Sequence, residues 1–200
     1  LELVEHLPVM ATWDDHDYGF NDSGIEFHKK EQAQKLFLDF FNVNKNSPRR
    51  KQSGIYNAKE FKTKEGSIKV IVLDTRYFRT ALIKAPKGTK KRYKANMDST
   101  GSVLGAMQWN WLENELNTSK ADFNIIVSSI QILSSEHGFE TWGNFPNEVE
   151  KLKNSIIKSK AKGVFLVSGD RHISEFSKTT VSNLKYPLID FTSSGLTHSY

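Results

Sequence analysis

Two short polar motifs in this sequence hold residue types that bind metal ions. Asp14-Asp15-His16-Asp17 follows the apolar run at residues 8–13, and Gly169-Asp170-Arg171-His172 follows another at 163–168. Carboxylate oxygens and imidazole nitrogens without thiolates suit hard cations, or mixed sites with Fe, Mn or Zn. Three carboxylates within four residues repel one another at a cost, unless a cation or an exposed loop relieves them.

The two motifs can form one site only if the elements before them end at a common edge. The apolar runs at 8–13, 124–130 and 163–168 predict buried strands, each followed by polar residues. In α/β proteins, ligands gather at the carboxyl ends of such strands. One tetrapeptide cannot complete a metal site, so we expect the two motifs to converge. Read singly, each motif also has a structural interpretation, with Asp14 capping a turn and Asp170 pairing with an arginine.

The remaining pattern predicts a chain of the α/β class. Apolar residues at helical spacing predict helices over 25–43, 105–116 and 146–160. Alternating or continuous apolar runs predict a hairpin of 55–61 with 68–74, and further strands at 174–181 and 186–192. Residues 80–103, rich in Lys, Pro, Gly and Ser, predict a long surface loop.

Composition limits the possible functions. The chain has 200 residues, 38% of them hydrophobic and 12% aromatic, which excludes a disordered polymer. Without cysteine there is no disulfide framework or cysteine nucleophile, and no apolar run is long enough to predict a membrane span. The net charge of +5 favours anionic substrates. Nucleic acid is not an expected partner, because Tyr93 is the only aromatic residue in the basic run 84–94.

Asp74-Thr75-Arg76 ends the strand predicted at 68–74 and has two interpretations. It is either a further element of the site, with Arg76 offering planar donors to a phosphate, or a structural ion pair that fixes the following loop. The sequence leaves both open.

Five ordered motifs give the chain a family resemblance over nearly its whole length. The first two are the segments 11–19 and 72–79, and the others are 108–112, 168–172 and 192–198. Together they closely resemble the alkaline phosphatase D (PhoD-like) family of calcineurin-like metallophosphatases. The resemblance implies an α/β fold, a mixed β-sandwich flanked by helices. It also implies a single domain over residues 1–200 that lacks its N-terminal strands, because the chain opens without Met inside an apparent element at 3–10.

The resemblance also implies roles for particular residues. His16 matches the catalytic histidine, and Asp15, Asp170 and His172 match metal ligands. Arg171 is a candidate for phosphate binding, as is Arg76 under one of its two interpretations. Weaker correspondences place Asp14, Asp17 and Asn21 near the metals, and Gln131 near a strand-end position that many relatives fill with His.

The implied reaction is hydrolysis of a small phosphoester by metal-activated water, with His16 stabilising or protonating the leaving oxygen. The implied cofactors are divalent or mixed metal ions: Fe with Ca, or Mn, Zn or Mg. Family members are often periplasmic or secreted. The family's first acidic motifs would precede residue 1, so we expect this chain alone to be inert. The alternative is a metal-free binding or scaffold module that keeps the fold; the oligomeric state is left open.

Overall fold

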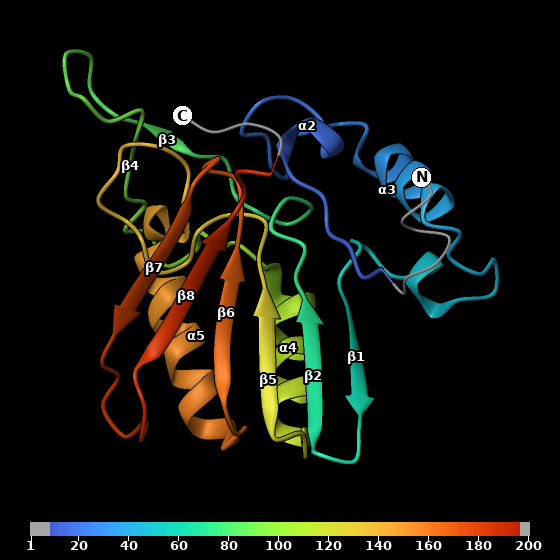
Figure 1. Ribbon diagram of the computed structural model, residues 1–200. Coiled ribbons are helices and arrows are strands. Elements are labelled where there is room, and N and C mark those ends of the chain that lie inside the picture. The colour runs from blue at the N-terminus through green and yellow to red at the C-terminus, as the bar shows by residue number, and fades with distance from the viewer. Residues whose placement is uncertain (1–8, 197–200) are drawn as a thin grey trace.

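The computed structural model describes residues 9–196 and contains one large mixed sheet. Its six strands lie in the order β1-β2-β5-β6-β8-β7 (Figure 1). Their bounds are β1 Asn57–Lys62, β2 Ser67–Val72, β5 Phe123–Val127, β6 Val164–Ser168, β7 Ser174–Thr179 and β8 Leu188–Ser193. Strands β2, β5, β6 and β8 are parallel, whereas the edge strands β1 and β7 are antiparallel to their neighbours. The carboxyl ends of the four parallel strands therefore meet at one edge of the sheet.

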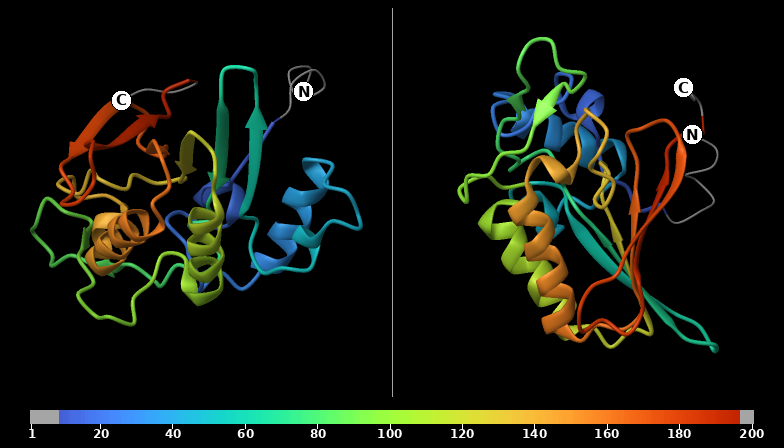
Figure 2. Two further views of the ribbon diagram at one scale, coloured as in Figure 1. Left: turned by 90° about the horizontal axis from the view of Figure 1, so that it is seen from below. Right: turned by 90° about the vertical axis from the view of Figure 1, so that its left-hand side faces the viewer.

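Helices α4 (Gly105–Thr118) and α5 (Pro146–Ser159) lie side by side against one face of the sheet (Figure 2). Trp109, Leu112 and Leu116 of α4 are almost fully buried in a core that also contains Ile126 and Leu166 of the sheet. Burying each such leucine stabilises the fold by roughly 1.5–3 kcal/mol. This mixed sheet flanked by helices confirms the predicted α/β fold class.

A second, smaller core holds the first polar motif above the sheet edge. Its buried residues include Trp13, Tyr18 of helix α2 (Asp15–Tyr18), Leu38 of helix α3 (Lys30–Phe40) and Ile55. The ring centroids of Trp13 and Tyr18 are 5.0 Å apart. Figure 1 shows α2 lying above the carboxyl ends of the parallel strands, with α3 to one side. A short 3-10 helix, η1 (Pro48–Arg50), lies between α3 and β1.

The prediction of a strand at 8–13 is wrong for residues 9–13, which pair with no strand of the sheet. Pro8 lies outside the described residues. Strand β2 already has β1 and β5 as its neighbours, so side chains tether this run instead. Thr12 Oγ1 donates to the Leu73 carbonyl at 2.6 Å, and Trp13 Nε1 donates to Asp74 Oδ1 at 2.8 Å. The element expected at 3–10 falls mostly outside the described residues.

Other boundaries differ more modestly. The helix predicted at 25–43 is confined to α3, and the strand predicted at 124–130 ends at Val127. Ser128 Oγ turns the chain there by donating to the Ile130 carbonyl at 2.6 Å. The long loop predicted at 80–103 contains a two-stranded ribbon of β3 (Ile83–Lys84) and β4 (Tyr93–Lys94). The 3-10 helix η2 (Trp142–Asn144) precedes α5.

None of the helices within residues 9–196 has the length and apolar character needed to cross a bilayer.

Candidate functional site

The two polar motifs line one pocket at the carboxyl edge of the parallel strands. The pocket has a volume of about 400 Å³. Its lining residues are Asp14, Asp15, His16, Asp17, Asn21, Asp22, Arg92, Phe139, Glu140, Asp170, Arg171, His172 and Ser194. The structure thus brings together Asp15 and His16, from the start of the chain, with Asp170 and His172 that follow β6.

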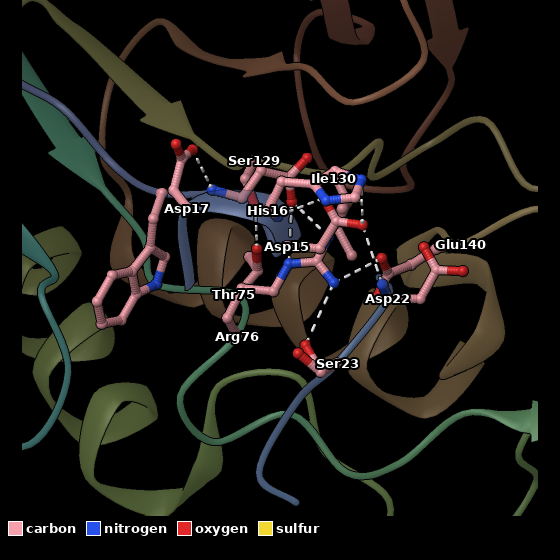
Figure 3. Close-up of polar contacts among 12 residues, drawn as sticks. Asp15, His16, Asp17, Asp22, Ser23, Thr75, Arg76, Ser129, Ile130 and Glu140 are labelled. Atoms are coloured by element: carbon pink, nitrogen blue, oxygen red, sulfur yellow. Dashed lines mark hydrogen bonds and ion pairs between the residues drawn. The ribbon is translucent and has the colours of Figure 1, made fainter. Parts of the chain in front are cut away.

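The carboxylate of Asp15 is held by backbone donors on both sides. Its Oδ1 accepts from the His16 N–H at 2.8 Å, and its Oδ2 accepts from the Asp22 N–H at 2.9 Å (Figure 3). The His16 side chain is 79% exposed, and its Nε2 lies 3.9 Å from Asp15 Oδ2. Asp15 is therefore fixed while the imidazole next to it is open to a ligand.

The second motif is a tight backbone turn at the end of β6. Asp170 and His172 take φ values of +70° and +53°, a left-handed conformation that is uncommon outside glycine and is often found at functional sites. The turn is fastened at two points. Gly169 N–H donates to the Ser129 carbonyl at 3.1 Å, and His172 N–H donates to Ser194 Oγ at 2.8 Å.

The pocket is crowded with acidic groups. Burial raises the pKa of Asp170 to about 8, and the nearby carboxylates of Asp14 and Glu140 add to the rise, against the lowering effect of Arg76. The ionised form of this carboxyl is thus disfavoured in the protein alone. A bound cation would favour it.

By residue type the pocket fits a divalent cation, since it offers carboxylates and imidazoles. Across the described range 9–196, however, no three such side chains lie close enough together to hold a metal ion. These residues supply donors from two motifs without forming a closed coordination sphere.

Arg76 lies behind the pocket wall rather than at its surface. Its side chain is fully buried, and its Nε donates to Asp14 Oδ1 at 2.9 Å. Its Nη1 pairs with Glu140 Oε2 at 2.7 Å (Figure 3). The other Glu140 oxygen pairs with Arg79 Nε at 2.9 Å. Burial alone would lower the pKa of Arg76, but Glu140 and Asp14 raise it overall. These contacts agree with the structural ion-pair interpretation of the strand end.

The weaker candidates lie in different places. Asp17 and Asn21 line the pocket, and Asp17 Oδ2 accepts from the Asp14 N–H at 3.3 Å. Gln131 is instead fully buried, where its Nε2 donates to Thr192 Oγ1 at 2.7 Å.

Sequence reasoning missed five residues of this pocket: Asp22, Arg92, Phe139, Glu140 and Ser194. The ribbon that carries Arg92 was expected to be solvated surface, but Arg92 Nη1 lies 3.2 Å from Asp22 Oδ2. The neighbouring Tyr93 hydroxyl donates to the same oxygen at 2.5 Å. A charged residue within the aromatic segment 137–142 was the available signal for Glu140.

Fold and site together define an α/β protein with an acid- and imidazole-lined pocket at the carboxyl ends of parallel strands. A family model described as "PhoD-like phosphatase" matches residues 2–198, so the chain belongs to the PhoD-like phosphatase family.

Among the proteins similar to this chain are a curated bacterial relative and a solved structure. Alkaline phosphatase D of Bacillus subtilis (strain 168) is 24% identical over 199 residues, covering 87% of this chain and 34% of the relative. A solved structure titled "Structure of PhoD" superposes with a TM-score of 0.68 at 22% identity, over 92% of this chain and 39% of that one. The chain therefore spans about a third of the length of the curated relative it matches.

Proposed function

We propose that this chain forms part of a metal-dependent hydrolase of small phosphoesters. The observation that carries the proposal is the meeting of two motifs from opposite ends of the chain in one pocket. Membership of the PhoD-like phosphatase family supports the reaction class.

In this proposal Asp15, Asp170 and His172 are ligands of a divalent metal ion. As the structure places residues 9–196, no three such side chains are close enough together to hold the ion by themselves. A bound divalent ion would stabilise charge on the phosphoryl oxygens and lower the pKa of a water that attacks in line.

His16 would act on the leaving group. Its exposed imidazole can donate a proton to the ester oxygen as the bond to phosphorus breaks, which is general acid catalysis. Asp15 fixes the backbone of His16 through the hydrogen bond to its N–H. Arg171, which lines the pocket on the turn between two proposed ligands, would offer planar donors to an anionic substrate.

Arg76 has a supporting role. Its buried guanidinium holds Asp14 in place, and Asp14 directly precedes the ligand Asp15. Its effect on the reaction would be indirect, through the position of helix α2.

The test is hydrolysis of 4-nitrophenyl phosphate and bis(4-nitrophenyl) phosphate by the longest polypeptide that contains this chain, with Mn²⁺, Zn²⁺, or Fe with Ca²⁺. We expect activity that EDTA removes, and that His16→Ala lowers by about 10²–10⁴-fold. His28→Ala is the matched control, because His28 is an exposed histidine outside the pocket. Equal activity of the two variants would contradict the role of His16. Metal-independent binding without turnover would favour the scaffold alternative.

A further inference from the structure

One side of the pocket holds a cluster of two arginines and a phenylalanine that the hydrolytic proposal does not fully use. The guanidinium carbon of Arg171 lies 4.0 Å from the ring centroid of Phe139, and that of Arg92 lies 5.4 Å from the same centroid. All three residues line the pocket. Arg171 comes from the turn after β6, Phe139 from the segment before η2, and Arg92 from the ribbon of β3 and β4.

The three side chains are held together by the backbone around them. The N–H groups of Arg92 and Tyr93 both donate to the Gly138 carbonyl, at 2.7 and 3.2 Å. A Cβ on Gly138 would lie 2.5 Å from the Lys91 Cα, so the two segments approach so closely that only glycine fits. The basic ribbon is therefore fixed directly against the segment that carries Phe139.

Stacking on an aromatic ring orients a guanidinium without using its in-plane N–H groups, one of which Arg92 directs at Asp22 Oδ2, 3.2 Å away. The Arg92 side chain is 52% exposed and Phe139 is 40% exposed, so this cluster remains accessible from solvent. Planar, oriented guanidiniums are suited to bidentate binding of a carboxylate or phosphate.

The acidic residues around this cluster restrict where in the pocket an anion can bind. The same pocket carries the carboxylates of Asp14, Asp15, Asp17, Asp22 and Glu140, which repel anions in general. An anionic group is favoured only where it contacts the arginines, on the side of the pocket that holds Phe139.

We propose that Arg92, Phe139 and Arg171 form a subsite for a second anionic group of the substrate, a carboxylate or a further phosphate on its alcohol portion. The inference rests on the proposed function, because it assumes that the scissile phosphate binds on the side of the pocket that holds Asp15 and Asp170. It deepens that function by naming the substrate class: phosphoesters whose leaving group is itself anionic.

The experiment compares phenylphosphonate with 4-carboxyphenylphosphonate, which cannot be hydrolysed and differ in one carboxylate. Their dissociation constants are measured by calorimetry in the presence of Mn²⁺, for the same protein and for Arg92→Gln and Phe139→Leu. We expect the carboxylated probe to bind about five- to tenfold more tightly to the unmodified protein. Each variant should weaken its binding by several-fold more than it weakens binding of phenylphosphonate.

Lys87→Gln is the matched control, since it removes one positive charge from an exposed position of the same ribbon and should keep the preference. Equal binding of the two probes, or no binding of either, would overturn the subsite. So would an equal loss for both probes in Arg92→Gln, which would place Arg92 at the scissile phosphate instead.

Hydrolysis of phenyl phosphate and 4-carboxyphenyl phosphate is measured in parallel. A preserved binding preference with no hydrolysis of either ester would support the subsite while contradicting the proposed function. Hydrolysis of both esters without a binding preference would support the proposed function while contradicting the subsite.

Discussion

Arg76, four residues beyond the end of β2, donates from Nε to the carboxylate of Asp14 at 2.9 Å, although the two residues are 62 positions apart. The same guanidinium pairs with Glu140 at 2.7 Å. One buried cation therefore joins the strand edge, the motif that begins helix α2 and the segment before η2. It links the sheet electrostatically to the wall of the pocket.

Removing this cation should destabilise the protein strongly. Arg76→Met leaves Glu140 buried with Arg79 alone and Asp14 without its partner. Breaking a buried ion pair from one side typically costs about 3–5 kcal/mol. Urea unfolding followed by circular dichroism should show a loss of that order.

The exposed Lys51→Met variant controls for the loss of a positive charge, and its unfolding free energy should stay within about 0.5 kcal/mol of the unmodified protein. Combining Arg76→Met with Glu140→Gln should cost less than the sum of the two single changes, because their shared contact is lost once. A small effect of Arg76→Met alone would mean that this link does not stabilise the fold.

Two glycines with similar φ values should respond differently to alanine. Gly54 and Gly88 have φ values of +84° and +89°, so both substitutions place an alanine at a positive φ. A Cβ on Gly54 would lie 2.9 Å from Asp74 Oδ2, whereas nothing lies within 4 Å of one on Gly88. Gly54→Ala should therefore lower the unfolding free energy by about 1–3 kcal/mol more than Gly88→Ala. Equal losses in thermal or urea unfolding would show that the region around Gly54 relaxes freely.

Alkaline pH should weaken the fold through its tyrosines. Burial raises the pKa of Tyr18 above its ordinary value of 10.0, and Asp74 adds to the rise; Tyr93 is shifted in the same direction by burial and by its hydrogen bond to Asp22. The folded protein holds these phenolic protons more tightly than the unfolded chain. The two protonated tyrosines therefore contribute fully to the free energy of unfolding below pH 10, and this contribution is lost as the pH rises above that value.

The matched variant is Tyr18→Phe, which also removes the hydrogen bond to the Gly24 carbonyl. At pH 8 it should be less stable by about 1 kcal/mol. Between pH 10 and 11 the unfolding free energy of Tyr18→Phe should fall less steeply than that of the unmodified protein. The two slopes should differ by as much as about 1.4 kcal/mol per pH unit. Parallel pH profiles, or ionisation of Tyr18 near pH 10 by absorbance at 295 nm without unfolding, would contradict the assigned direction.

Metal removal should lower stability as well as activity. If the ion binds only the folded protein, Mn²⁺ at 100 times its dissociation constant stabilises by about 2.7 kcal/mol. Excess EDTA should lower the melting temperature by the corresponding amount, and added Mn²⁺ should restore it. A melting temperature that is independent of Mn²⁺ and EDTA would mean that no ion binds the native state under those conditions.

Elements with a strong apolar pattern were predictable from the sequence. Helices α4 and α5 and strands β2 and β6 lie close to their predicted positions, because their apolar residues recur at helical spacing or form runs of strand length. Residues 9–13 have the same apolar character yet form no strand, since the hydrogen bonds of Thr12 and Trp13 side chains take the place of a ladder.

The pocket was predictable only where chemistry is concentrated in a short motif. Asp15, His16, Asp170 and His172 were found because acids and imidazoles cluster directly after apolar runs. Glu140 and Arg92 carry no such local signal. Their partners, Arg76 and Asp22, are distant in the sequence and meet them only through the fold.

The central claim, that the motif at Asp15 and the motif at Asp170 hold the same metal ion, is tested most directly by a double-mutant cycle on Mn²⁺ affinity. Calorimetric titration would compare the unmodified protein with Asp15→Asn, Asp170→Asn and the double variant. Each single change should weaken binding, and the double variant should bind little worse than the weaker single one, a coupling of roughly 1 kcal/mol or more. Effects that add within about 0.5 kcal/mol, or no Mn²⁺ binding at all, would contradict it.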